Sequence, residues 1–177
     1  MAPHRKMIYF KGDFAMISPT YGSCTDEQMT NIIANYIRTN GRNSEGFNFV
    51  VGTDSQNYSD TKIVVVVAVQ NIGRGGIFFY EVQRVRKISN IRQKLLYETS
   101  LSLQYADRVI SKFESYCGEQ HVGLEKVNFC IHVDAGRNGK TNKLIPDLVA
   151  WVRSCGYDCK VKPDSFAASS IADKISK

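Results

Sequence analysis

Residues 47–54, FNFVVGTD, form an apolar strand-like run that ends in an aspartate, Asp54. Strand-like segments also end in aspartate at residues 127–134 (VNFCIHVD) and 157–164 (YDCKVKPD). Each aspartate alone is compatible with an ordinary turn, where this residue is common. Three carboxylates at three strand ends together indicate a shared site for divalent metal ions, since hard cations bind oxygen ligands.

A long helix is predicted between the first two of these segments. From Asn90 to about Tyr116, apolar residues recur at three- and four-residue spacing. Glu98, in LLYETSLSLQY, lies on this apolar face. A glutamate that points inward needs a partner. The alternatives are a boundary position or a buried pair with an arginine, and we expect Glu98 to lie with the aspartates.

Five strands and several helices are predicted around these segments. The first three strands are joined by short polar turns, which favours an antiparallel meander, and the third has the pattern of an edge strand. Helices separate the remaining strands. The expected strands are residues 47–53, 62–70, 77–86, 127–133 and 159–162, and the expected helices after them are residues 90–116, 142–155 and 164 onward.

Helical crossovers place the first, fourth and fifth strands parallel. Asp54, Asp134 and Asp164 then lie at the carboxyl ends of parallel strands, where ligand sites of α/β sheets form. If these strands are neighbours, the three carboxylates lie within roughly 10 Å of one another.

Two candidates compete for the last carboxylate of the cluster. Asp164 follows Pro163 and precedes a helix, so an N-cap role is the alternative. Asp173 follows nine residues later, about 13 Å along a helix. Because Asp164 stays level with the other strand ends, we prefer it, and we expect Asp173 to form an ion pair.

Two other features near the aspartates invite a functional interpretation. His132 shares strand parity with Asp134, but a histidine in this position is more often satisfied in the core, which we expect here. The loop GRNGKT, residues 136–141, fails the P-loop pattern, because Asp134 occupies the place of the required first glycine. Its backbone, Arg137 and Lys140 can still contact phosphate, and a solvated loop is an equal alternative.

The N-terminal region differs from the rest of the chain. Residues 1–24 have little periodicity and are interpreted as an extension, in which Met7–Phe10 is compatible with a strand or a loop. Residues 25–177 are interpreted as a single domain that begins with a helix. Thr25–Gln28 matches a capping box, and an apolar stripe follows as far as the helix stop at Asn40-Gly41.

The composition of the chain limits the classes of protein to which it can belong. The chain has 177 residues, 43% of them hydrophobic, which fits one globular domain. The five cysteines complete no zinc pattern and favour free thiols in a reducing compartment. No run has the length of a membrane span or a signal core, so we expect a cytoplasmic protein. A net charge of +6 disfavours basic substrates and suits a polyanion such as nucleic acid.

Four segments resemble the YkuK-like family of predicted ribonuclease H-like proteins, within the ribonuclease H-like superfamily. They are VGTDSQ, YETSLSL, HVDAGRNGKTNKLI and GYDCKVKPDSFAASSIADKISK, and the resemblance runs from about Phe47 to the C-terminus. It implies an α/β fold with a mixed five-stranded sheet in the order 3-2-1-4-5, in which strand 2 is antiparallel and helices flank the sheet. It says nothing of residues 1–24.

The resemblance also implies a site and a chemistry. Asp54, Glu98, Asp134 and Asp164, with Asp173 as the rival of the last, would bind two Mg²⁺ or Mn²⁺ ions. The implied activity is hydrolysis of phosphodiester bonds in RNA or DNA, and the alternative is a nucleic-acid-binding module without turnover. Candidate contacts to the nucleic-acid backbone are Arg84, Arg86, Lys87, Arg92, Arg137, Lys140 and Lys162.

Overall fold

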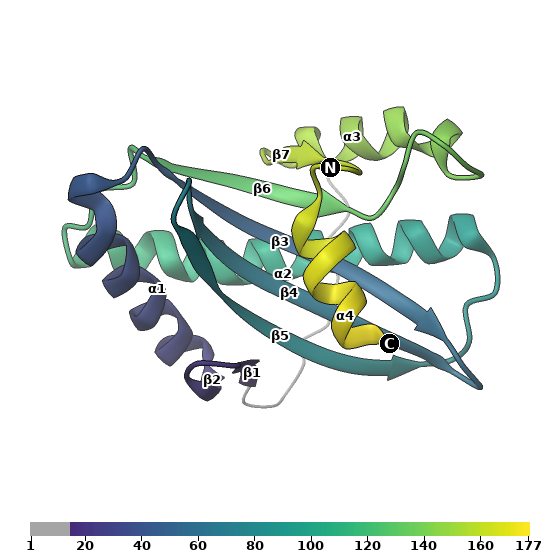
Figure 1. Ribbon diagram of the computed structural model, residues 1–177, viewed down its shortest axis with the longest axis horizontal. Coiled ribbons are helices and arrows are strands. Elements are labelled where there is room, and N and C mark those ends of the chain that lie inside the picture. Colours follow the sequence, from purple (N-terminus) through teal and green to yellow (C-terminus); the bar gives the residue numbers. More distant parts are fainter. Residues whose placement is uncertain (1–14) are drawn as a thin grey trace, which may run out of the picture.

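A seven-stranded mixed sheet forms the centre of the molecule. The computed structural model describes residues 15–177, so the Met7–Phe10 segment lies outside the described residues. The strand order is β2-β1-β5-β4-β3-β6-β7 (Figure 1). The strands are β1 (Ala15–Ser18), β2 (Gly22–Thr25), β3 (Phe47–Asn57), β4 (Thr61–Asn71), β5 (Gly75–Val85), β6 (Val127–Val133) and β7 (Asp158–Lys160).

Helices cover both faces of this sheet. In Figure 1, α2 lies behind the sheet, and the C-terminal helix crosses in front of it. Among the described residues, none of the helices is long and apolar enough to cross a membrane. The helices are α1 (Asp26–Asn40), α2 (Ile91–Glu119), α3 (Ile145–Ser154) and a C-terminal helix of π-type turns (Ala167–Ala172) followed by α4 (Asp173–Ser176), with short 3₁₀ turns at Gly41–Asn43 and Asn142–Leu144.

The capping box predicted for the first helix is confirmed. The Thr25 hydroxyl accepts a hydrogen bond from the Gln28 backbone N–H, and the Gln28 side chain accepts one from the Thr25 N–H. Two of the free N–H groups at the start of α1 are thereby satisfied.

The prediction of a five-stranded sheet is wrong. Residues 15–25 form the hairpin β1–β2, and β1 pairs with β5 where Ile17 lies opposite Tyr80. The full strand order therefore differs from the predicted one by this hairpin, and β5 is not an edge strand. Strands of four residues are too short to show a clear alternation of polar and apolar residues, so the sequence pattern did not reveal them.

The directions of the central strands agree with the prediction from the helical crossovers. β3 is antiparallel to β4 and parallel to β6, and β6 is parallel to β7. β7 is shorter than expected and ends at Lys160. The carboxyl ends of β3, β6 and β7 therefore point the same way.

The two faces of β3 and β4 carry two separate cores. Odd-numbered residues such as Phe49, Val51 and Val65 pack with α2, whereas Val50 and Val64 pack with the C-terminal helix. Burial on both faces explains why the sequences of these strands are continuous apolar runs without polar alternation.

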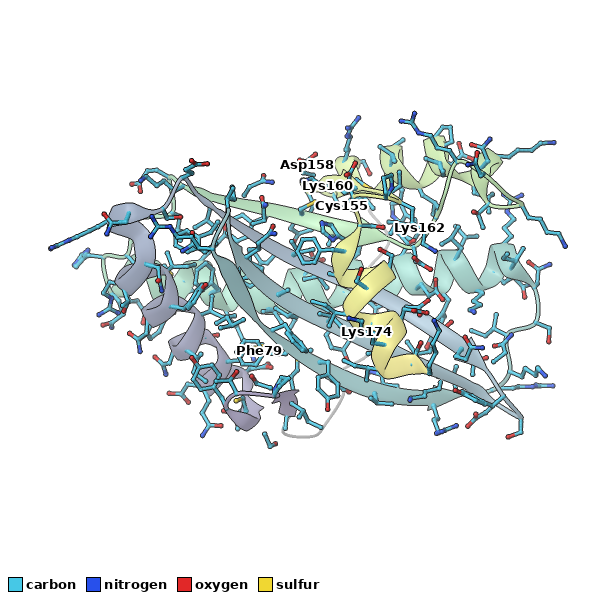
Figure 2. The ribbon with its side chains drawn as sticks, viewed as in Figure 1. Phe79, Cys155, Asp158, Lys160, Lys162 and Lys174 are labelled. Atoms are coloured by element: carbon cyan, nitrogen blue, oxygen red, sulfur yellow. The ribbon has the colours of Figure 1, made fainter. Side chains whose placement is uncertain are left out.

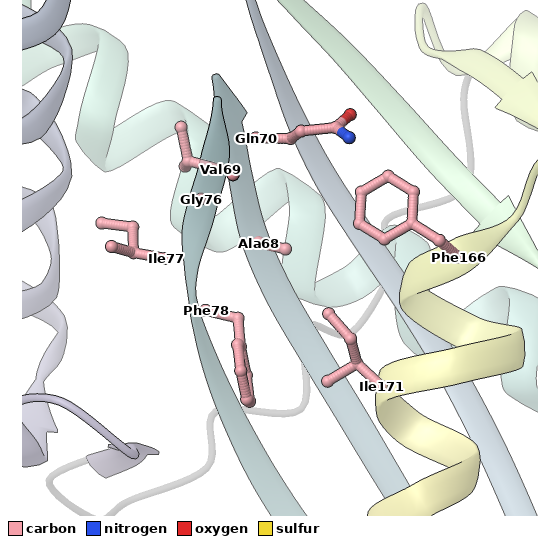
Figure 3. Close-up of a pocket in the computed structure, with 9 residues that line it drawn as sticks. Ala68, Val69, Gln70, Gly76, Ile77, Phe78, Phe166 and Ile171 are labelled. Carbon is pink, nitrogen blue, oxygen red and sulfur yellow. The ribbon is translucent and has the colours of Figure 1, made fainter. Parts of the chain in front are cut away.

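The C-terminal helix leaves part of the second core open. A cavity of about 170 Å³ lies between this helix, the end of β4 and the start of β5. Phe166 and Ile171 line it from the helix, and Phe78 lines it from β5 (Figure 3). The helix packs on β3 and β4, and its last residues lie at the carboxyl end of β3, where Ser176 hydrogen-bonds Asp54.

Candidate active site

Asp54 and Asp134 occupy equivalent positions on neighbouring parallel strands. The last paired residues of β3 and β6 are Thr53 and Val133, so each aspartate is the next residue along its strand. β3 continues to Asn57 against β4, whereas β6 stops. Since neighbouring strands lie about 4.8 Å apart, the two side chains meet where this ladder ends. The structure thus brings these two predicted site residues together.

The environment of Asp54 disfavours a negative charge. Burial raises the pKa of Asp54 to about 6, and the charge of Asp134 adds to this effect. A hydrogen bond from the Ser176 hydroxyl to Asp54 Oδ2, 3.0 Å long, acts in the opposite direction. A buried carboxylate beside a second carboxylate is stabilised by a proton or a cation between the two groups.

Glu98 is buried on α2, as predicted, with 5% of its surface exposed. Its carboxylate accepts a hydrogen bond from the Ser55 hydroxyl. Burial, together with the charges of Asp54 and Asp134, raises the pKa of Glu98 to about 8. Ser55 and Asp54 point to opposite faces of the sheet because they are consecutive strand residues. Glu98 therefore approaches the end of β3 from the face opposite to Asp54.

The C-terminal helix brings Asp173 towards Asp54. The expectation that a helix would carry Asp173 away from the strand ends is wrong, because this helix folds back over β3. Lys62 of β4 donates to the Ile175 carbonyl oxygen, which fixes the end of the helix beside β4. The charge of Asp173 contributes to the raised pKa of Asp54. As predicted, Asp173 also forms an ion pair, with Lys177 at 2.7 Å.

Asp164 lies apart from this group. It is exposed in the segment that follows β7, and its backbone N–H donates to the Val161 carbonyl oxygen. The charges that raise the pKa of Asp54 are those of Asp134 and Asp173, and those that raise the pKa of Glu98 are Asp54 and Asp134. Asp173 therefore lies near Asp54, whereas Asp164 lies in the exposed segment after β7.

A lysine already neutralises part of the site. Lys162 Nζ lies 2.9 Å from Asp134 Oδ1. The same oxygen is buried and accepts no hydrogen bond of good geometry within residues 15–177, so the lysine compensates its charge without a directed bond. An oxygen of this kind, beside a second carboxylate, fits a divalent cation.

The other carboxylates are held away from such an ion. Glu98 is bonded to Ser55, and Asp173 is paired with Lys177. Over residues 15–177, no group of three or more acidic, histidine or cysteine side chains lies close enough to hold a metal. Asp54 and Asp134 are the two carboxylates available to a cation at the strand ends, and Glu98 and Asp173 would join them only after leaving Ser55 and Lys177.

Two basic loops flank the aspartate pair. Arg86, Lys87 and Arg92 are exposed in and just after the connection from β5 to α2. The Asn57 side chain donates to the Ile88 carbonyl oxygen in that connection, which places the loop at the carboxyl end of β3. On the other side, Arg137 and Lys140 are exposed in the loop after Asp134. Lys162, which forms an ion pair with Asp134, lies on the same side.

Arg84 differs from these residues. Its guanidinium forms an ion pair with Asp60 at 2.7 Å and lies over the ring of Tyr58. Since these contacts compete with phosphate, it is a weaker candidate for contact with nucleic acid than the loop residues.

Sequence reasoning missed Ser55 and Ser176, which hydrogen-bond Glu98 and Asp54. The Ser55 contact follows from strand alternation, because the residue after Asp54 must face α2. The Ser176 contact depends on how the C-terminal helix folds back, which no local pattern in the sequence encodes.

His132 belongs to the core, as expected. It is buried, its Nδ1 accepts a hydrogen bond from the Ala167 N–H at 3.2 Å, and its ring meets that of Phe166 edge to face. Burial, helped by the charge of Lys160, lowers the pKa of His132 to about 3. The neutral imidazole therefore holds the start of the C-terminal helix against β6.

Replacing His132 by Asn is expected to make the protein less sensitive to acid. Between its ordinary pKa of 6.5 and the folded value of about 3, the folded state binds fewer protons at this residue than the unfolded chain does, so stability falls as pH falls. Asparagine keeps an acceptor for the Ala167 N–H and does not titrate. The lost packing should cost about 1–2 kcal/mol at pH 7.

Thermal unfolding at pH 7 and pH 4.5 measures this effect. The difference in stability between wild type and His132→Asn should shrink at pH 4.5. A difference that is the same at both pH values would contradict the proposed burial of the neutral imidazole.

Comparisons with known proteins identify the family of the chain. The model of the family described as "Ribonuclease H-like" matches residues 28–177. The chain is also similar to the uncharacterized protein YkuK of Bacillus subtilis (strain 168), with 31% identity over 137 residues. That similarity covers 72% of this chain and 77% of the Bacillus protein. No solved structure gives a significant match.

Proposed function

Because the chain belongs to the ribonuclease H-like family and is related to YkuK, we propose that it is a nuclease that hydrolyses phosphodiester bonds of RNA or DNA with divalent metal ions. The observation that carries the proposal is the pair of Asp54 and Asp134 at the ends of adjacent parallel strands. Their mutual repulsion and burial favour a bound cation in place of two free charges.

The residues of the site divide the work between them. Asp54 and Asp134 would hold the metal from the sheet, Glu98 would add a ligand from α2, and Asp173 would add one from the C-terminal helix in preference to Asp164. When bound, Mg²⁺ or Mn²⁺ (two ions) would supply an activated water and charge stabilisation for the leaving oxygen. The exposed cations of the two flanking loops bind the phosphate backbone, so binding should weaken as salt concentration rises.

A metal titration against defined substrates tests the proposal. Labelled single-stranded, duplex, hybrid and branched nucleic acids are incubated with the protein and increasing Mn²⁺ or Mg²⁺. The expected result is cleavage of at least one substrate that requires the metal and stops when EDTA is added. Absence of metal-dependent products with all four substrates would refute the assignment as a nuclease.

A nucleic-acid-binding module without turnover is the second candidate. It is favoured by the internal partner of each carboxylate, namely Ser176 for Asp54, Ser55 for Glu98 and Lys162 for Asp134. This candidate predicts salt-sensitive binding of the same substrates with no product at any metal concentration. The titration therefore separates the two candidates directly.

A further inference from the structure

A polar pocket lies next to the aspartate pair, at the end of β7. It has a volume of about 490 Å³, which is within the range of small-ligand sites. Its walls are Arg137 on the loop after β6 and the segment 159–164, which contains Lys160 and Lys162. Both lysines are labelled near β7 in Figure 2. The pocket is therefore distinct from the aspartate pair but close to it.

The pocket carries an excess of positive charge. Arg137, Lys160 and Lys162 line it, against the carboxylate of Asp164 in its wall and that of Asp134, which pairs with Lys162. Arg137 is exposed and Lys160 is half-buried, so both can turn towards a ligand, and Lys162 can do so by leaving Asp134. A concave site with this excess of cations favours an anion, and above all one that carries more than one negative charge.

The walls of the pocket are fixed to each other and to the aspartate pair. The Lys162 backbone N–H donates to the Ala135 carbonyl oxygen at 2.9 Å, which joins the segment after β7 to the loop after Asp134. The Lys162 side chain then reaches Asp134, with 2.9 Å between Nζ and Oδ1. One lysine thus borders both the pocket and the carboxylate site, so an anion in the pocket would lie beside the reacting phosphodiester.

We propose that this pocket binds a terminal phosphate group of the nucleic-acid substrate; the inference rests on the proposed function. A terminal phosphomonoester carries a charge of about −1.5 to −2 at pH 7 and three acceptor oxygens, whereas a phosphodiester inside the chain carries one charge. The excess of cations in the pocket suits the terminal group better. The phosphate of either a 5′ or a 3′ end supplies this chemistry.

Equilibrium binding in EDTA tests the pocket without cleavage. The probes are one short labelled single strand in three forms, with a 5′ phosphate, with a 3′ phosphate and with hydroxyls at both ends, measured by fluorescence anisotropy. Wild type should bind one phosphorylated form about tenfold more tightly than the unphosphorylated form, since hydrogen bonds between charged groups are stronger than those between neutral groups. The preferred form identifies the end.

Two pocket variants and a distant one locate the effect. Arg137→Ala and Lys160→Ala should each remove most of the preference for the phosphorylated end. Arg74→Ala removes the same charge from the exposed turn between β4 and β5 and should leave the preference unchanged. Equal binding of all three probes by wild type, or a preference that survives both pocket variants, would overturn the inference.

The outcome for the pocket is separate from that for the nuclease. Cleavage without a preference for phosphorylated ends would leave the proposed function intact and reject the pocket. A preference that depends on Arg137 in a protein that cleaves nothing would support the pocket and reject the nuclease.

Discussion

Replacing Asp134 by Asn should reduce metal-dependent cleavage by at least about 100-fold while the protein still folds, since even residues that only support metal ligands contribute about 10–100-fold. Asparagine has the shape of aspartate but lacks the charge that a divalent ion requires. The fold should tolerate the change, because Asp134 is only half-buried and its partner Lys162 is exposed. Initial rates of Mn²⁺-dependent cleavage and urea unfolding measure the two effects.

Asp147→Asn is the matched control for this variant. Asp147 is exposed in the first turn of α3, outside the group of carboxylates around Asp54. The control should cleave at the wild-type rate. Cleavage by Asp134→Asn at the wild-type rate would mean that the aspartate pair takes no part in the reaction.

Replacing Glu98 by Gln should change how stability depends on pH in the absence of metal. Burial raises the pKa of Glu98 from 4.5 to about 8, so the folded state keeps a proton that the unfolded chain has lost. Wild-type stability should therefore fall as pH rises from about 4.5 to about 8, and Gln removes this dependence. Between pH 5 and pH 8.5, the free energy of unfolding of the variant should rise relative to that of wild type by on the order of 2–4 kcal/mol.

Urea unfolding in EDTA at these two pH values measures the gain. The raised pKa of Asp54 contributes a dependence of the same sign, but it is present in both proteins and largely cancels in the difference. Glu114→Gln, on the exposed face of α2, is the control and should follow wild type. Parallel pH profiles for wild type and Glu98→Gln would show that Glu98 is not held in a protonated form.

The parts of the site that depend on strand pairing were predictable from the sequence. Helical crossovers between β3, β6 and β7 require parallel strands, and Asp54 and Asp134 each follow an apolar run. The burial of Glu98 followed from helical periodicity, since its neighbours at three- and four-residue spacing are apolar. These features are local in sequence or follow from simple rules of chain connection.

The features that the sequence did not predict depend on tertiary packing. The hairpin β1–β2 joins the sheet through strands of four residues, which are too short for a periodic signal. Asp173 reaches Asp54 because the C-terminal helix crosses β3 and β4. A rise of 1.5 Å per residue gives the length of a helix but not its direction, and the direction of this helix brings Asp173 near Asp54.

A calorimetric titration of Mn²⁺ into the wild-type protein and the Asp54→Asn and Asp134→Asn variants tests directly whether the aspartate pair holds a metal. If these two aspartates form the metal site, wild type should bind Mn²⁺, and each variant should bind it at least about tenfold more weakly. Equal Mn²⁺ affinity in wild type and both variants would contradict the account, because the carboxylates at the ends of β3 and β6 would then not hold the metal.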